Sequence, residues 1–119
     1  MKIGTDIIQI SRIEKSLAQF GDKFKQRFLQ PQEIMLVQKT ASIAGFWAAK
    51  EAIAKALGCG IGKELSFHDI VLDKDSRGRP MFLLSQEAQK IHRIKESSIS
   101  ISHDGGFAIA VAVISQQIP

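Results

Sequence analysis

The sequence predicts an α+β domain in which an antiparallel sheet packs against a long central helix, with short helices around it. Two observations near the chain ends support the sheet: residues 3–8 and 107–114 are short runs rich in β-forming residues. A third supports the helix, because Ser42 to Leu57 is alanine-rich with apolar residues at helical spacing. Strands bracket the helices, so a regular βαβ alternation is not expected.

Length and composition indicate one ordinary globular domain spanning residues 1–119, with 45% hydrophobic residues. No apolar run is long enough to cross a bilayer. Asp6 interrupts the first apolar run, and no signal-peptide layout follows, so we expect a cytoplasmic protein without membrane contact. The single cysteine, Cys59, cannot form an internal disulfide and is expected to be a small filler after a helix.

The first third of the chain predicts one strand and three helices. Residues 3–8 form the strand, with Asp6 inside it. Apolar residues at helical spacing follow up to Phe20, and Ser11 with Glu14 suggests a capping box at the start of that helix. A second short helix is expected around residues 24–28, and a third starts at a proline, at residues 31–37.

The long helix, Ser42 to Leu57, is the most strongly indicated element, and Gly58 just beyond it fits a C-terminal cap. Its helical geometry places Glu51 and Lys55 away from its main apolar stripe. Lys50 falls within that stripe. It must therefore extend to solvent or meet an anion in a partly buried site.

The last part of the chain alternates β-rich runs with turn signals. Strands are predicted at residues 67–72, 80–84, 98–102 and 107–114, and a helix at 86–94. Pro80 makes the second of these strands an edge strand. His103-Asp104-Gly105-Gly106 joins the last two strands as a hairpin around an Asp-Gly turn.

A net charge of +4 and a pI of about 9.4 favour an anionic partner without choosing among nucleic acid, a nucleotide and an acidic protein. Part of the positive charge is concentrated in one early segment. This segment is either a binding surface for an anionic partner or simply a solvated helical face. Its members are Arg12, Lys15, Lys23, Lys25 and Arg27.

Several residues could carry chemistry, and each also has an ordinary structural explanation. Asp6 is either a charge that protects an edge strand or a ligand for Mg²⁺, which prefers hard oxygen donors. Glu51 and Lys55 form either a surface pair or part of the same site. His103 at a strand end is commonly structural. His68 and His92 match no motif, and the spacing of the histidines does not suggest zinc.

Three stretches together resemble a known family. They are IGTDII at residues 3–8, WAAKEAIAKALG at residues 47–58 and SISH at residues 100–103. In this order and in a chain of this length, they are similar to the holo-acyl-carrier-protein synthases, the short 4′-phosphopantetheinyl transferases. One position departs from the family, because Phe46 stands where an arginine is often found.

The resemblance implies an enzyme that transfers 4′-phosphopantetheine from coenzyme A to a serine of apo-acyl carrier protein, releasing 3′,5′-ADP, in fatty acid biosynthesis and hence lipid metabolism. By the same resemblance, Asp6 and Glu51 hold Mg²⁺ and act in catalysis together with Lys55. The residues expected to bind coenzyme A are Lys55, His103, Lys50, Gly78, Arg79 and Pro80.

The resemblance also implies partners. The acidic carrier protein would dock on Arg12, Lys15, Lys23 and Arg27. The family works as a homotrimer with sites between subunits, and we expect His103 and the Gly78–Pro80 turn to be hard to bring to the Asp6 site within one small chain. Two alternatives are a basic nucleic-acid-binding module and a non-catalytic nucleotide-binding domain. The first explains the charge but not the pairing of Asp6 with Glu51.

Overall fold

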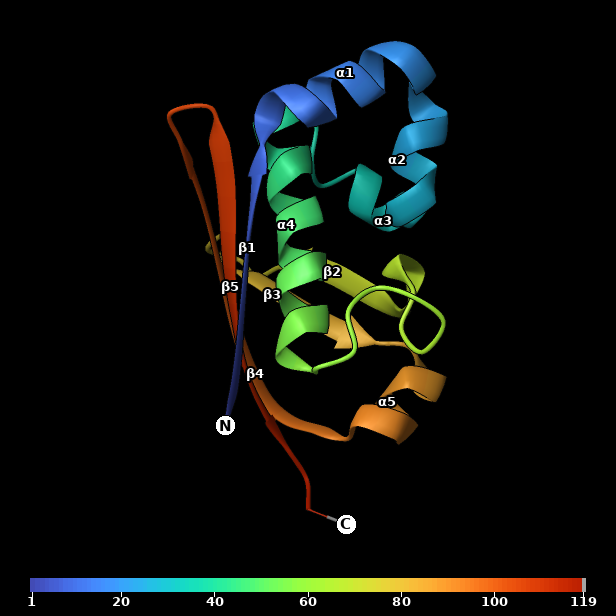
Figure 1. Cartoon of the computed structure of the whole chain (residues 1–119), viewed down its shortest axis with the longest axis vertical. Coiled ribbons are helices and arrows are strands. Elements are labelled where there is room, and N and C mark those ends of the chain that lie inside the picture. The colour runs from blue at the N-terminus through green and yellow to red at the C-terminus, as the bar shows by residue number, and fades with distance from the viewer. Residues whose placement is uncertain (119) are drawn as a thin grey trace.

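The computed structural model describes residues 1–118 and confirms the α+β class. Two antiparallel sheets and a long central helix organise the chain, and shorter helices cover the side of that helix remote from the larger sheet (Figure 1). The elements in order are β1 (Lys2–Gln9), α1 (Ile10–Phe20), α2 (Asp22–Phe28), α3 (Pro31–Ile34), α4 (Thr40–Ala56), η1 (Phe67–Asp69), β2 (Ile70–Lys74), β3 (Pro80–Leu84), α5 (Gln86–His92), β4 (Ile94–Asp104) and β5 (Phe107–Gln116).

The larger sheet has the order β1-β5-β4, and α4 lies across one of its faces (Figure 1). The register pairs Asp6 with Ala110 and Ala110 with Ile101, so these three residues form one row across the sheet. No helix covers the opposite face in Figure 1. The smaller sheet is the β2-β3 hairpin. None of the helices within residues 1–118 combines the length and the apolar character needed to cross a bilayer.

Small side chains let α4 lie close against the larger sheet. A Cβ atom added at Gly4 of β1 would collide with the backbone of Ala52 and Ala56 in α4. Alanines on β5, among them Ala108 and Ala110, are also completely buried. Because helix and strand meet almost backbone to backbone, the position of α4 relative to β1 is closely defined.

The start of α1 differs from the predicted capping box. The helix begins at Ile10, directly after β1, and its cap residue, Gln9, makes no side-chain cap hydrogen bond. Ser11 therefore lies inside the helix. The Ile10 N–H instead donates to the carbonyl oxygen of Gly106, 2.9 Å away in the β4–β5 turn, so a helix-end donor is satisfied by tertiary structure.

The last hairpin is longer than predicted. β4 begins at Ile94 and continues to Asp104, so that His103 lies within the strand and not in the turn. Gly105 and Gly106 make the turn, with φ of 58° and 85°, conformations that favour glycine. Helix α5 ends at His92, before a left-handed Arg93. Residues 67–69 form a 3₁₀ turn, so the predicted strand there begins three residues later.

Candidate functional site

An acidic site lies where β1 passes beside α4. Asp6 points from β1 toward the helix, and its side chain is only 15% exposed. The Lys55 ammonium donates to Asp6 Oδ1 at 2.9 Å and to the Thr5 carbonyl oxygen at 3.2 Å. Glu51 lies one helical turn before Lys55 on the same side of α4. The structure thus brings together the three residues predicted for catalysis.

Glu51 differs from its neighbours because its carboxylate makes no hydrogen bond or ion pair within residues 1–118. Burial raises the pKa of Glu51, and the negative charge of Asp6 raises it further, while Lys55 opposes both effects. A half-buried carboxyl beside a second carboxylate is a place where a cation would be stabilised. The oxygen donors of Asp6 and Glu51 match the preference of Mg²⁺, so these residues fit the predicted metal.

Lys50 is a correction to the expected coenzyme site. Its side chain is completely buried, and its ammonium donates to Glu33 Oε1 at 2.9 Å and to the carbonyl oxygens of Phe28 and Phe67 at 2.6 Å and 3.0 Å. All three ammonium protons have acceptors, so none remains for a phosphate. Burial lowers the pKa of Lys50, and the hydrogen bond and charge of Glu33 oppose that shift. Lys50 therefore does meet an anion in a buried site, but this anion is the Glu33 carboxylate of the same chain and not a phosphate of coenzyme A.

His103 lies in a second region, in a pocket of about 170 Å³ that also contains Gly78 and Pro80. The structure brings His103 and the Gly78–Pro80 turn together within one chain, because β4 runs beside β3. Sequence reasoning missed Lys74, which lines the same pocket. Lys74 pairs with Pro80 in the hairpin register, whereas the predicted strand stopped at residue 72.

Phe46 forms part of the same pocket. Its ring is almost completely buried, and the Lys74 ammonium lies 5.9 Å from the ring centroid. An ammonium at this distance from an aromatic face is weakly stabilised by it. Where the family often has an arginine, this chain therefore has an aromatic side chain with a lysine beside it.

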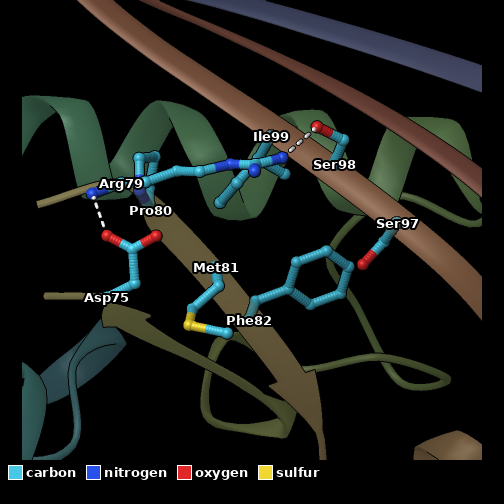
Figure 2. Close-up of a pocket in the computed structure, with 8 residues that line it drawn as sticks. All are labelled: Asp75, Arg79, Pro80, Met81, Phe82, Ser97, Ser98 and Ile99. Atoms are coloured by element: carbon cyan, nitrogen blue, oxygen red, sulfur yellow. Dashed lines mark hydrogen bonds between the residues drawn. The ribbon is translucent and has the colours of Figure 1, made fainter. Parts of the chain in front are cut away.

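Arg79 lines an adjacent pocket of about 260 Å³ between β3 and β4. Figure 2 shows its side chain reaching toward Ser98, whose Oγ lies 3.4 Å from a guanidinium nitrogen. The Arg79 backbone N–H donates to Asp75 Oδ1 at 2.9 Å, which fixes the turn before β3. Met81 and Phe82 provide apolar surface in the same pocket (Figure 2). The Gly78–Pro80 turn thus contributes to both pockets.

The acidic site and the His103 pocket lie on opposite flanks of α4. Ser42 lines the His103 pocket and is nine residues before Glu51, which at about 100° per residue places the two side chains about 180° apart. Both regions lie on the face of the sheet that α4 covers, and α4 stands between them. A single chain therefore does not surround one ligand with both sets of residues.

The predicted basic segment belongs to two helices. Arg12 and Lys15 are exposed on α1, and Lys23 and Arg27 are exposed on α2. The Arg27 guanidinium lies 5.1 Å from the centroid of the Phe20 ring, which holds it near the α1–α2 junction. The segment is thus a positively charged surface formed by two short helices.

Comparison with known proteins gives consistent results for sequence and structure. The family profile of the 4′-phosphopantetheinyl transferase superfamily matches residues 2–112. The holo-[acyl-carrier-protein] synthase of a Sulfurovum species is 65% identical over 114 residues, which cover 96% of each chain. That of a Nitratiruptor species is 54% identical over 112 residues, covering 94% of this chain and 97% of the relative.

Solved structures agree. The Helicobacter pylori holo-[acyl-carrier-protein] synthase in complex with coenzyme A has a TM-score of 0.92 at 54% identity, with 95% of this chain and 99% of that chain covered. A holo-(acyl-carrier-protein) synthase from Bacillus anthracis, in complex with CoA (3′,5′-ADP), has a TM-score of 0.82 at 40% identity, covering 98% and 96% of the two chains.

The Lys50–Glu33 pair yields a test of its structural role. Replacing Lys50 by Met leaves Glu33 buried and uncompensated, and should lower the free energy of unfolding by about 3–5 kcal/mol in urea titrations. The double variant Lys50→Met with Glu33→Gln removes the unpaired charge and should recover part of that loss. If the single variant instead kept its urea midpoint and lost only affinity for coenzyme A, the structural assignment would be wrong.

Proposed function

The chain belongs to the 4′-phosphopantetheinyl transferase superfamily and, within it, to the holo-[acyl-carrier-protein] synthases, and we propose that it acts with Mg²⁺ in fatty acid biosynthesis in the cytoplasm. It is an enzyme that transfers 4′-phosphopantetheine from coenzyme A to a serine of apo-acyl carrier protein. The observation that carries the proposal for this chain is the grouping of Asp6, Glu51 and Lys55 between β1 and α4. Membership of an enzyme family sets aside the nucleic-acid-binding and non-catalytic alternatives.

In the proposed mechanism, the charges of this site support each step of the transfer. The serine oxygen forms a bond to the β-phosphorus of coenzyme A, the bond from that phosphorus to the oxygen of 3′,5′-ADP breaks, and the serine proton passes to a water ordered by Asp6 and Glu51. Mg²⁺ bound by these carboxylates would neutralise charge on the pyrophosphate. Lys55 keeps Asp6 oriented and presents its ammonium, which is about half exposed, to a phosphate oxygen.

The His103 pocket is the proposed place for the nucleotide end of coenzyme A. His103 and Lys74 offer donors to phosphate, and the Gly78–Pro80 turn and Phe46 provide backbone and apolar surface. Arg79 can reach a phosphate from the adjacent pocket. In this assignment Lys74 supplies the positive charge that an arginine at position 46 often supplies in the family.

The two regions would complete one site if chains associate. The uncovered face of the larger sheet carries a group of exposed apolar side chains on β1 and β5. Its most exposed members are Ile3 at 71% and Ile7 at 61%, and Phe107 and Ile109 lie beside them. An apolar sheet face of this kind is typical of an interface between subunits. We therefore retain the homotrimer with shared sites as part of the proposal.

The carrier protein would dock on the basic surface of α1 and α2. That surface, formed by Arg12, Lys15, Lys23 and Arg27, is exposed and begins directly after the strand that carries Asp6. An acidic partner approaching it would bring its serine toward the acidic site.

The first prediction tests the reaction and the metal. Mass spectrometry of apo-carrier incubated with the enzyme, coenzyme A and Mg²⁺ should show the gain of one phosphopantetheine group. Glu51→Gln should slow this gain by about 100-fold or more and raise the Mg²⁺ requirement, because a charged oxygen donor is lost. Glu96→Gln, an exposed glutamate on β4, is the matched control. Unchanged Mg²⁺ dependence in Glu51→Gln would contradict the assignment.

The raised pKa of Glu51 also predicts how the stability of the fold depends on pH. A carboxyl whose pKa is higher in the folded state than its usual 4.5 stabilises the fold when protonated, and this contribution is lost as pH rises through the folded pKa. At neutral pH without Mg²⁺, Glu51→Gln should therefore melt at a higher temperature than the wild type. The difference should vanish below about pH 4, and Mg²⁺ should stabilise only the wild type.

The carrier surface gives the next prediction. Arg12→Glu should raise KM for the acidic carrier roughly tenfold, because it reverses a charge in the docking surface, and should leave KM for coenzyme A nearly unchanged. Lys95→Glu, on β4, makes the same change in net charge elsewhere and should have little effect. If Arg12→Glu changed only KM for coenzyme A, Arg12 would have to lie at the nucleotide and not at the carrier surface.

Assembly can be tested by complementation. Asp6→Ala and His103→Ala subunits are each expected to be inactive, and mixing them under conditions that allow exchange should restore part of the activity. Ile7→Glu should convert the trimer to monomers in sedimentation, whereas Leu83→Glu, at an even more exposed apolar position on β3, should not. A wild-type monomer that is fully active would rule out shared sites.

A further inference from the structure

Three side chains with metal-binding atoms meet at the far end of α4. Cys59 follows that helix, Glu64 lies further along the same loop, and His92 is the last residue of α5. Their sulfur, carboxylate oxygen and imidazole nitrogen atoms all lie within 4.8 Å of one another. This cluster takes no part in the transfer reaction described above. His92 is distant in sequence from Cys59 and Glu64, which is why their spacing did not suggest a site.

His92 is the unusual member of this cluster. Its side chain is only 5% exposed, and its Nε2 has no hydrogen-bond partner within residues 1–118. That nitrogen lies 3.4 Å from Glu64 Oε2, but without hydrogen-bond geometry. Buried polar atoms in folded proteins are almost always satisfied, so an unpartnered nitrogen aimed at a carboxylate and a thiol indicates a missing partner.

We propose that Cys59, Glu64 and His92 bind one Zn²⁺ ion, with water as the fourth ligand. A thiolate, an imidazole and a carboxylate are the donors that Zn²⁺ takes in proteins. Nitrogen and oxygen ligands about 2.0–2.1 Å from a tetrahedral ion lie about 3.3–3.4 Å apart, which matches the separation of His92 Nε2 and Glu64 Oε2. Glu64 is half exposed, so solvent can reach the open position.

Binding requires a proton to leave Cys59. The thiol now lies 3.9 Å from the Ala54 carbonyl oxygen, toward which it donates. Burial raises the pKa of the Cys59 thiol, and the nearby carboxylate of Glu64 raises it further. A cation in the cluster opposes both effects, because its positive charge stabilises the thiolate and offsets the negative charge of Glu64. Each ion bound therefore releases one proton, and the affinity falls as the pH is lowered.

The zinc site and the magnesium site differ in chemistry and position. Asp6 and Glu51 offer only oxygen, whereas the Cys59 cluster offers sulfur and nitrogen as well, which Mg²⁺ does not prefer. A bound Zn²⁺ would tie the loop after α4 to the end of α5, near the lower end of the molecule in Figure 1. It would stabilise the fold by an amount that grows with the logarithm of its free concentration, without entering the transfer reaction.

The test uses Co²⁺ as a spectroscopic substitute for Zn²⁺ on the full reduced chain, with excess Mg²⁺ present. One equivalent of Co²⁺ should give a thiolate-to-cobalt charge-transfer band that Zn²⁺ abolishes by displacement. Cys59→Ser should lose the band, and Glu64→Gln should weaken Co²⁺ binding at least tenfold. Asp6→Ala and the control Glu96→Gln should keep both the band and the affinity. Zn²⁺ should also raise the melting temperature of the wild type but not of Cys59→Ser.

Two results would overturn the proposal. One is the absence of any charge-transfer band at one equivalent of Co²⁺. The other is a Glu64→Gln variant that binds Co²⁺ as tightly as the wild type, which would mean that the thiol binds metal without its neighbours. His92→Asn extends the test if that variant folds. If it does not, Glu64→Gln still decides, because Glu64 is exposed and its replacement does not disturb the core.

Discussion

The close packing of α4 against β1 is the constraint on which the rest of the structure depends. Gly4 leaves no room for a side chain beneath Ala52 and Ala56, so the helix lies almost directly on the strand. Two residues further along β1, Asp6 then falls within hydrogen-bonding distance of Lys55. The acidic site therefore follows from backbone geometry. A helix held further from the sheet by larger side chains would separate the charges that we propose act in the reaction.

A second fixed point is the buried pair of Lys50 and Glu33. Through it α4 is tied to the end of α2, the middle of β2 and the 3₁₀ turn at once, because Lys50 donates to the carbonyl oxygens of Phe28 and Phe67 and Glu33 accepts from the Leu72 N–H. An aromatic cluster of Phe24, Phe28, Trp47 and Phe67 surrounds this region. A buried ion pair such as Lys50–Glu33 contributes little net stability, but it makes any arrangement that leaves one of the two charges unpaired unfavourable.

The sequence could predict what depends on local pattern. The long helix was clear from its periodicity, and the order of its residues placed Glu51 and Lys55 on one side and Lys50 on another. The partner of Lys50 could not be predicted, because Glu33 comes from a short helix whose position depends on tertiary packing. The start of α1 was misread because its first N–H bonds to Gly106, far along the chain.

Adjacent residues on α4 have opposite tasks. Lys50 is held inside by three acceptors, and Glu51, about 100° further around the helix, turns toward Asp6. The rotation of α4 about its own axis is therefore constrained on two sides, by the buried ammonium of Lys50 and by the carboxyl of Glu51 beside Asp6. An insertion or deletion of one residue between Glu51 and Ala56 would rotate both out of place together, by about 100° relative to the helix surface that packs on Gly4. Change in this helix during evolution must consequently proceed by substitution, with its length preserved.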